Sequence, residues 1–156
     1  MLLVICLLPS CGLPDIRIKR KVATSELVGT WVLDPKSSAM AKDHDGDTYV
    51  PATGQPHTIV FNADGTCHYR SVLQMPTRYV DASGDWSIVT PTDNPKGCEV
   101  KIILNSASTG TTQFSLDLKE ESGHLILWQF WSDPDLWNFL EYKRTQAEQG
   151  ASPSRP

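Results

Sequence analysis

Short segments that alternate strictly between apolar and polar side chains constrain this chain more than any other feature of its sequence. In the segment 112–119, Phe114, Leu116 and Leu118 alternate with polar residues, and the segment 98–105 repeats the pattern. An extended strand with this alternation has one apolar face to bury. No segment keeps the 3.6-residue apolar period of an amphipathic helix. The pattern therefore predicts an all-β fold.

Eight segments have strand character, and most connections between them are short enough to join antiparallel neighbours. The predicted strands are 29–33, 57–61, 66–73, 84–89, 98–105, 112–119, 124–131 and 137–144. Sequential hairpins close a meander without the crossovers of a Greek-key sandwich, so we expect an eight-stranded antiparallel up-and-down barrel. The one long connection, 34–56, contains a single helix-like stretch at 37–42.

The second and third segments also predict a register. The turn at 62–65 ends in Asp-Gly, which suits a hairpin loop whose glycine adopts the left-handed conformation. With such a turn, Phe61 lies opposite Cys67, and Ile59 lies opposite Tyr69. These four side chains then share one apolar face, as expected for a sheet covered on one side.

Length and charge exclude several classes of protein. The chain has 156 residues, of which 40% are hydrophobic and 21% charged, which fits one globular domain. From residue 23 onward, 10 Lys and Arg stand against 17 Asp and Glu, a net charge of about −7. Such a body offers no clustered basic face for nucleic acid. Arg17, Lys19, Arg20 and Lys21 form a basic stretch, which we interpret as a tether near anionic lipid or as a solvated linker.

The N-terminus indicates export. Residues 1–8 are apolar but too few to span a bilayer, as in a signal-peptide core. Leu8-Pro9-Ser10-Cys11 resembles the lipobox of bacterial lipoproteins, which implies lipidation at Cys11, and Gly12 then resembles lipoproteins sent to the outer membrane. We therefore predict a lipid-anchored envelope protein facing the periplasm. The alternative is an apolar N-terminus without a targeting role.

These assignments predict four parts of the chain. They are a lipoprotein-type signal peptide at 1–10, a lipidated Cys with a basic tether at 11–25, a barrel domain at 26–144, and a disordered tail at 145–156. The tail is rich in Gln, Gly, Ser and Pro and contains no large apolar residue.

Cysteine usage agrees with export. Once Cys6 is removed with the signal peptide and Cys11 is acylated, Cys67 and Cys98 remain to form a disulfide. Their separation is 31 residues, and such a loop would contribute about 3 to 4 kcal/mol on the chain-entropy estimate. The alternative is a pair of buried free thiols.

The segment Glu26-Leu-Val-Gly-Thr-Trp31 resembles the opening strand of lipocalin-like domains. The segments 61–66 and 139–144 are similar to the second hairpin and last strand of bacterial members, so that the resemblance covers about residues 26–144. In this family a Gly-x-Trp, here Gly29 and Trp31, closes one end of the barrel, and a basic side chain of the last strand packs over the indole. The resemblance implies that Arg144 makes this cation–π contact, a structural rather than a catalytic role.

Metal and catalytic chemistry find little support. The acidic loop 43–47 lacks EF-hand spacing, and the four histidines, at 44, 57, 68 and 124, lie on separate segments without zinc-ligand spacing. No nucleophile elbow, phosphate loop or dinucleotide fingerprint is present. We therefore expect a protein that is not an enzyme and needs no metal or cofactor.

Two hypotheses for function remain. In the first, the barrel binds a small apolar ligand among inward-facing side chains of the strands; the candidate ligand-binding residues are Ile59, Phe61, Tyr69, Ile102, Phe114 and Leu116. In the second, the barrel is packed and recognises a protein partner, as an envelope inhibitor or assembly factor, through aromatic residues of the last hairpin. The candidate surface is Trp131, Trp137 and Phe139.

Overall fold

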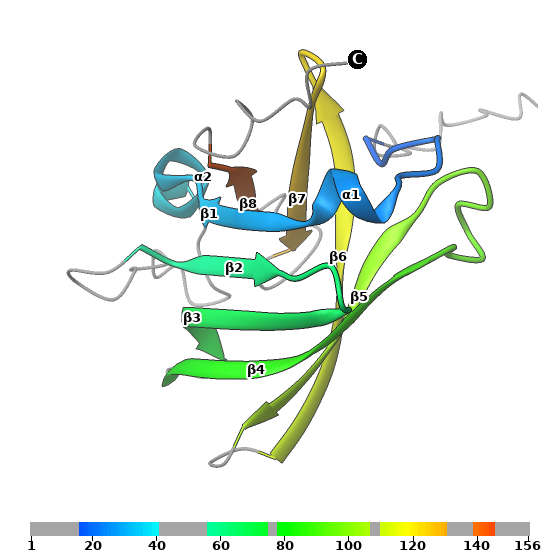
Figure 1. Cartoon of the computed structure of the whole chain (residues 1–156). Helices are drawn as coiled ribbons and strands as arrows, with labels where there is room; N and C mark the ends of the chain where they lie inside the picture. Colours follow the sequence, from blue (N-terminus) through cyan, green and yellow to red (C-terminus); the bar gives the residue numbers. More distant parts are fainter. Residues whose placement is uncertain (1–15, 41–55, 75–77, 107–109, 131–138, 146–156) are drawn as a thin grey trace, which may run out of the picture.

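The computed structural model describes residues 16–40, 56–74, 78–106, 110–130 and 139–145 (Figure 1). The helices and strands are α1 (Thr24–Leu27), β1 (Gly29–Leu33), α2 (Pro35–Met40), β2 (Thr58–Phe61), β3 (Thr66–Gln74), β4 (Arg78–Val89), β5 (Glu99–Ser106), β6 (Gly110–Glu121), β7 (His124–Phe130) and β8 (Phe139–Arg144). The strands form one closed barrel in chain order, and every neighbouring pair is antiparallel, including β8 with β1. The predicted all-β, eight-stranded up-and-down barrel is confirmed.

The predicted register of the second hairpin is also confirmed. Phe61 pairs with Cys67, and Ile59 pairs with Tyr69. Gly65 has a φ of +87°, the left-handed conformation that the turn requires, and the amide of Asn62 donates to the carbonyl of Thr66 at 2.9 Å. The turn chemistry of four residues therefore decides which side chains of β2 and β3 face the interior.

β4 begins at Arg78, six residues before the predicted start. Gly84, the predicted first residue of this strand, lies within β4 opposite Leu104 of β5. A Cβ atom at Gly84 would lie 1.9 Å from the carbonyl oxygen of Ile103. Glycine is needed here because β4 and β5 approach closely, not because the chain turns.

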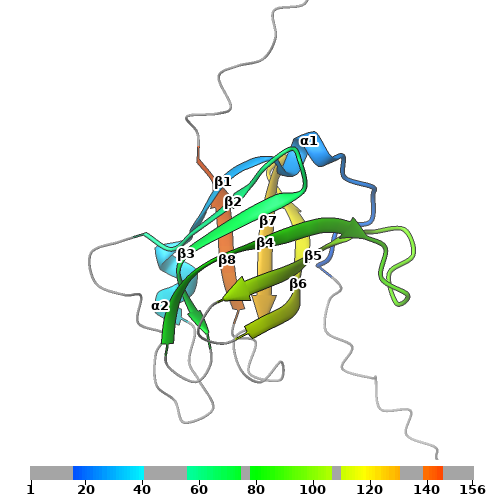
Figure 2. The same ribbon diagram turned by 60° about the horizontal axis from the view of Figure 1, so that its bottom comes forward.

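The strands wrap around one interior (Figure 2), and the side chains on their inward faces form a single buried core. Rings contact each other across the interior, since Tyr69 of β3 and Phe114 of β6 have centroids 5.6 Å apart in an edge-to-face arrangement. The largest side chains exposed by less than 2% are Trp31, Tyr69, Tyr142, Phe61, Leu27, Ile59, Ile102, Leu116, Leu118, Leu127, Leu140 and His57.

One end of the barrel, which we call the base, is closed by residues 16–28, the N-terminal strap. The turns at 62–65 and 122–123 and the connection 90–98 also lie at this end. Ile18, Val22 and Leu27 of the strap are buried in the core, and the amide of Ile18 donates to the carbonyl of Leu118 at 2.7 Å. The strap is thus part of the barrel domain.

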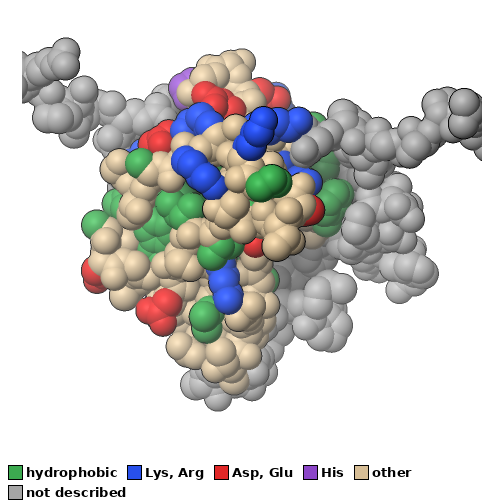
Figure 3. Space-filling model, turned by 90° about the vertical axis from the view of Figure 1, so that its right-hand side faces the viewer, with side chains coloured by type: hydrophobic (Ala, Val, Ile, Leu, Met, Phe, Trp, Pro, Cys, Tyr) green, Lys and Arg blue, Asp and Glu red, His purple; other side chains and the backbone are tan. Residues whose placement is uncertain are grey.

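The basic residues of the strap form ion pairs and hydrogen bonds with the rest of the barrel domain. Arg17 pairs with Asp93 at 2.6 Å, and Arg20 pairs with Glu26 at 2.9 Å and with Glu120 at 3.1 Å. The side chain of Lys21 donates to Thr90 and to the carbonyl of Gly97. Figure 3 shows Lys and Arg side chains gathered on this side of the molecule with acidic side chains beside them. From residue 16 the stretch expected as a tether therefore packs on the barrel, because the acidic body supplies partners for its charges.

α2 provides the helix that was expected at 37–42, beginning two residues earlier. Asp34 precedes it, and its side chain accepts a hydrogen bond from the amide of Lys36 at 3.2 Å, which ends β1 and starts the helix. The helix lies against β8, where the amide of Glu141 donates to the hydroxyl of Ser37 at 3.0 Å. In the part of the chain that the structure covers, no helix is long and apolar enough to cross a membrane.

Candidate functional site

The interior of the barrel holds the six candidate ligand-binding residues together. They come from β2, β3, β5 and β6, and their register places them on the inward face. Five of them are buried, and Phe114 is half-buried and packs against the core. The sequence pattern thus identified a set of neighbours in space, and their role in binding remains a prediction.

Two tyrosine hydroxyls face this interior without a hydrogen-bond partner in the described part of the chain. Tyr69 is 1% exposed and Tyr142 is fully buried, and neither hydroxyl oxygen has a partner. Tyr142 lies opposite Leu127 of β7 and Leu33 of β1, both inward residues. Burial raises the pKa of both tyrosines above the usual value of 10. Both hydroxyls are therefore protonated and able to donate at neutral pH.

Sequence reasoning placed Tyr142 on the inward face with Leu140 but did not include it among the ligand-binding candidates. The alternation of β8 gave the signal for its direction, since Leu140 and Tyr142 are buried. The local sequence pattern does not reveal that the Tyr142 hydroxyl lacks a hydrogen-bond partner. That property depends on side chains from several strands that meet only in the folded barrel.

Trp31 and Arg144 lie opposite each other in the register of β1 and β8 at the base. The cation–π contact that the lipocalin resemblance implies for them remains a prediction. Trp31 is fully buried, and its indole N–H donates to the carbonyl of Leu27 at 2.8 Å. Gly29, which begins β1, pairs with Phe61. The Gly-x-Trp segment therefore joins the strap and two neighbouring strands to the core.

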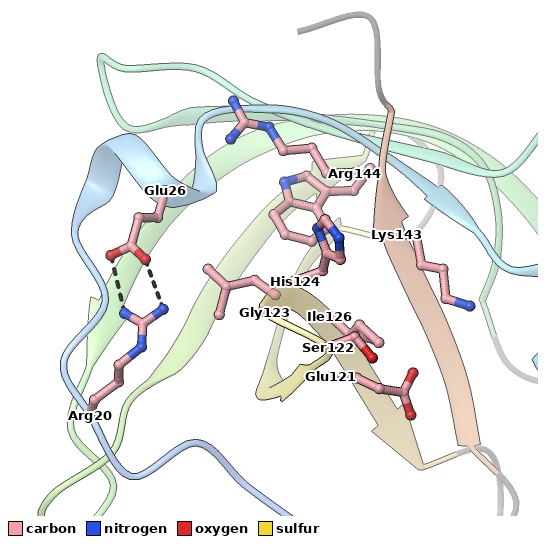
Figure 4. Close-up of a pocket in the computed structure, with 11 residues that line it drawn as sticks. Arg20, Glu26, Glu121, Ser122, Gly123, His124, Ile126, Lys143 and Arg144 are labelled. Carbon is pink, nitrogen blue, oxygen red and sulfur yellow. Dashed lines mark hydrogen bonds and ion pairs between the residues drawn. The ribbon is translucent and has the colours of Figure 1, made fainter. Parts of the chain in front are cut away.

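A pocket of about 510 Å3 lies beside this pair, between the strap and the turn from β6 to β7. Figure 4 shows Arg20 and Glu26 on one side and Glu121, Ser122, Gly123 and His124 on another, with the Lys143 side chain directed away from the Arg20–Glu26 pair. The hydrogen bond from Arg20 lowers the pKa of Glu26, and hydrogen bonds to Glu26 and Glu120 raise the pKa of Arg20. The lining contains both acidic and basic side chains, and two of them, Arg20 and Glu26, neutralise each other in an ion pair.

Aromatic side chains also cluster on the outer face of β7 and β8. Trp128 packs edge-to-face on Phe130 and Phe139, with centroids 5.2 and 6.1 Å apart. Lys119 lies over Phe139 and pairs with Glu141. Phe139 is half-buried, while Phe130 is 37% exposed. Trp131 and Trp137, the other candidates for a partner surface, lie outside the described residues.

The predicted disulfide between Cys67 and Cys98 is wrong, because both residues are free buried thiols. Cys67 pairs with Gly84, which pairs with Leu104, six residues along β5 from Cys98. That offset is about 20 Å of strand, whereas a disulfide requires Cα atoms within about 7 Å. The strands start at the same end, but the stagger of the barrel separates the two residues. Burial, with a smaller effect of Asp85, raises the pKa of Cys67 to about 11.

The described histidines are dispersed. His57 is buried, which lowers its pKa below 6.5, and His68 is 2.7 Å from the hydroxyl of Ser83. Across the described ranges, no three His, Cys, Asp or Glu side chains gather as metal ligands would. The acidic loop 43–47 and the lipidation candidate Cys11 lie outside those ranges.

Comparisons of the chain with protein-family models, with curated proteins and with solved structures found no match. The closed antiparallel barrel is consistent with a calycin-like fold.

Proposed function

We propose that this protein binds a small apolar molecule inside its barrel and acts as a carrier rather than an enzyme. The observation that supports the proposal is the enclosure of aliphatic and aromatic side chains from four strands within one closed barrel. Eight strands form the smallest barrel that can enclose one ligand. The side chains proposed to contact it are the six named from the sequence.

We further propose that the protein is a lipocalin-like lipoprotein of the bacterial envelope. The lipobox-like segment before Cys11 and the cross-strand pair of Trp31 and Arg144 support this assignment. Lipidation at Cys11 would hold the barrel at the outer membrane, facing the periplasm. Intact-mass measurement of protein from the membrane fraction tests it, since an acyl mass on a chain beginning at Cys11 is expected, and an unmodified full-length chain would refute it.

Fluorescence titration with the neutral probe N-phenyl-1-naphthylamine tests the carrier function. The wild-type protein is expected to bind the probe, and Leu116→Phe, which adds volume inside the barrel, is expected to weaken binding by about tenfold or more. The control is Ser115→Phe, one residue away on the exposed outer face. Equal affinity of both variants, or no binding by the folded wild type, would contradict the proposal.

The second candidate function is recognition of a protein partner through the outer aromatic cluster. The exposure of Phe130 beside buried Trp128 favours it. A folded protein that fails to bind the neutral probe, but whose association with an envelope protein is lost on Phe130→Ala, would support this function over the carrier.

A further inference from the structure

Two interior tyrosines, Tyr69 and Tyr142, differ from two interior tryptophans, Trp31 and Trp86, in how their polar atoms are satisfied. The indole N–H groups of Trp31 and Trp86 donate to the carbonyls of Leu27 and Asn62 at 2.8 and 3.0 Å. The hydroxyls of Tyr69 and Tyr142 have no such partner within the described residues. Most buried polar side-chain atoms in folded proteins are hydrogen-bonded, so each exception calls for an explanation.

The two hydroxyls belong to one region of the interior. Tyr69 continues the inward row that runs from Trp31 of β1 through Ile59 of β2, and Tyr142 lies opposite Leu33 on the other side of β1. Tyr142 is also among the groups that raise the pKa of Tyr69, after burial, as expected for two rings in the same part of the interior. Two donors thus lie on the inward face of the barrel among apolar side chains of the core.

We propose that the ligand is an uncharged amphipathic molecule whose carbonyl, ester or ether oxygen accepts hydrogen bonds from Tyr69 and Tyr142. This inference rests on the proposed carrier function and defines the class of ligand. The apolar body would lie against Phe114, Ile102 and Leu116, while the oxygen would supply the acceptor that both hydroxyls lack.

The charges near the tyrosines favour a neutral ligand over a carboxylate. The side chains that act on Tyr69 are Tyr142 and Cys67, which burial keeps neutral at pH 7, and the nearest charge acting on Cys67 is the carboxylate of Asp85. Arg144 faces the base, where it lines the pocket beside Trp31. Among the described residues, no cation is one of the groups that act on Tyr69, so a carboxylate beside its hydroxyl would be desolvated at a greater cost than a neutral oxygen.

The test uses three probes of equal chain length, namely heptane, 2-heptanone and heptanoate, each displacing N-phenyl-1-naphthylamine at pH 7. Replacement of both tyrosines, Tyr69→Phe with Tyr142→Phe, is expected to lower the affinity for 2-heptanone by about tenfold. Heptane is expected to bind the double variant within twofold of the wild type. The matched control, Trp86→Phe, removes an interior donor that already has a partner and should leave the ketone affinity within twofold.

Several outcomes would overturn the inference while leaving the carrier function intact. These are a ketone affinity unchanged in the double variant, as expected if ordered water satisfies the hydroxyls, or heptanoate binding more tightly than 2-heptanone. If the folded wild type binds neither the fluorescent probe nor heptane, the carrier function itself fails. Circular dichroism of each variant verifies that the barrel is folded in every comparison.

Discussion

Two pairs of large aromatic residues in the barrel interior differ in whether their polar atoms have hydrogen-bond partners. Trp31 and Trp86 are buried, and each indole donates to a backbone carbonyl of a neighbouring turn or helix. Tyr69 and Tyr142 are also buried, yet their hydroxyls have no partner in the described structure.

This difference separates a structural region from a candidate binding region. A satisfied buried donor stabilises the fold, whereas an unsatisfied one costs about 1 to 3 kcal/mol until a partner arrives. The indole N–H groups of Trp31 and Trp86 are satisfied by the protein itself. The hydroxyls of Tyr69 and Tyr142 lack a partner within the described residues and gain one only from an additional acceptor, so variants of the two regions should respond in opposite directions.

The largest effect is expected at the base, for Trp31→Ala. Removing a fully buried indole leaves a cavity and an unpaired carbonyl at Leu27, so the free energy of unfolding should fall by about 3 to 5 kcal/mol. Urea unfolding followed by circular dichroism measures it. A loss below about 1 kcal/mol would mean that the strap and barrel do not close around this residue.

A smaller effect of opposite sign is expected for Tyr142→Phe without ligand. Deleting a buried hydroxyl that has no partner should leave stability unchanged or raise it by up to about 1 kcal/mol. Trp86→Phe, by contrast, should lower it by about 1 kcal/mol or more, because the carbonyl of Asn62 loses its donor. If Tyr142→Phe is instead destabilised as much as Trp86→Phe, the two regions do not differ as described.

The Arg20–Glu26 pair at the base predicts a modest dependence of stability on pH. The folded-state pKa of Glu26 is lowered from 4.5, chiefly by its hydrogen bond with Arg20. Its contribution is therefore full above pH 4.5 and is lost as pH falls through the folded-state value. Because both side chains are more than one-third exposed, Glu26→Gln should cost less than about 1 kcal/mol at pH 7. The difference in the free energy of unfolding between the wild type and Glu26→Gln should become smaller in acid and in high salt, as measured by urea unfolding. A difference that does not depend on pH would contradict this account.

The smallest expected effect is that of reductant, which should not change stability. Cys67 and Cys98 are free thiols, so dithiothreitol should leave both the intact mass and the melting temperature unchanged. A disulfide would have contributed about 3 to 4 kcal/mol. A mass increase of two hydrogens on reduction would show that the strand stagger is not as the structure has it.

Local patterns in the sequence were sufficient to predict the barrel. All eight strands were located from alternating apolar residues and from turn residues, because the alternation indicates which face of a strand is buried. The Asp64-Gly65 turn fixed the register between β2 and β3. The candidate interior residues were brought together for the same reason, since same-face residues of neighbouring strands must meet.

What the sequence did not predict depends on contacts between distant residues. The strap was expected to be a tether because its partners, Asp93 and Glu120, lie far along the chain and give no local signal. The disulfide prediction failed because strand order alone does not give the stagger between Cys67 and Cys98. The fourth strand was predicted to start six residues too late, at Gly84, whose close approach to Ile103 of the neighbouring strand is not visible in the sequence.

The closure of the base by the strap also bears on how the barrel is oriented when the protein is attached to a surface. The strap enters at the base, and the amide of Thr145, just past β8, donates to the carbonyl of Thr30 at 3.0 Å near the same end. Residues 16 and 145, the first and last that the structure describes, therefore lie at the same end of the barrel. A surface attached directly at residue 16 or at residue 145 would therefore face the base, and α2 would lie at the opposite end of the barrel.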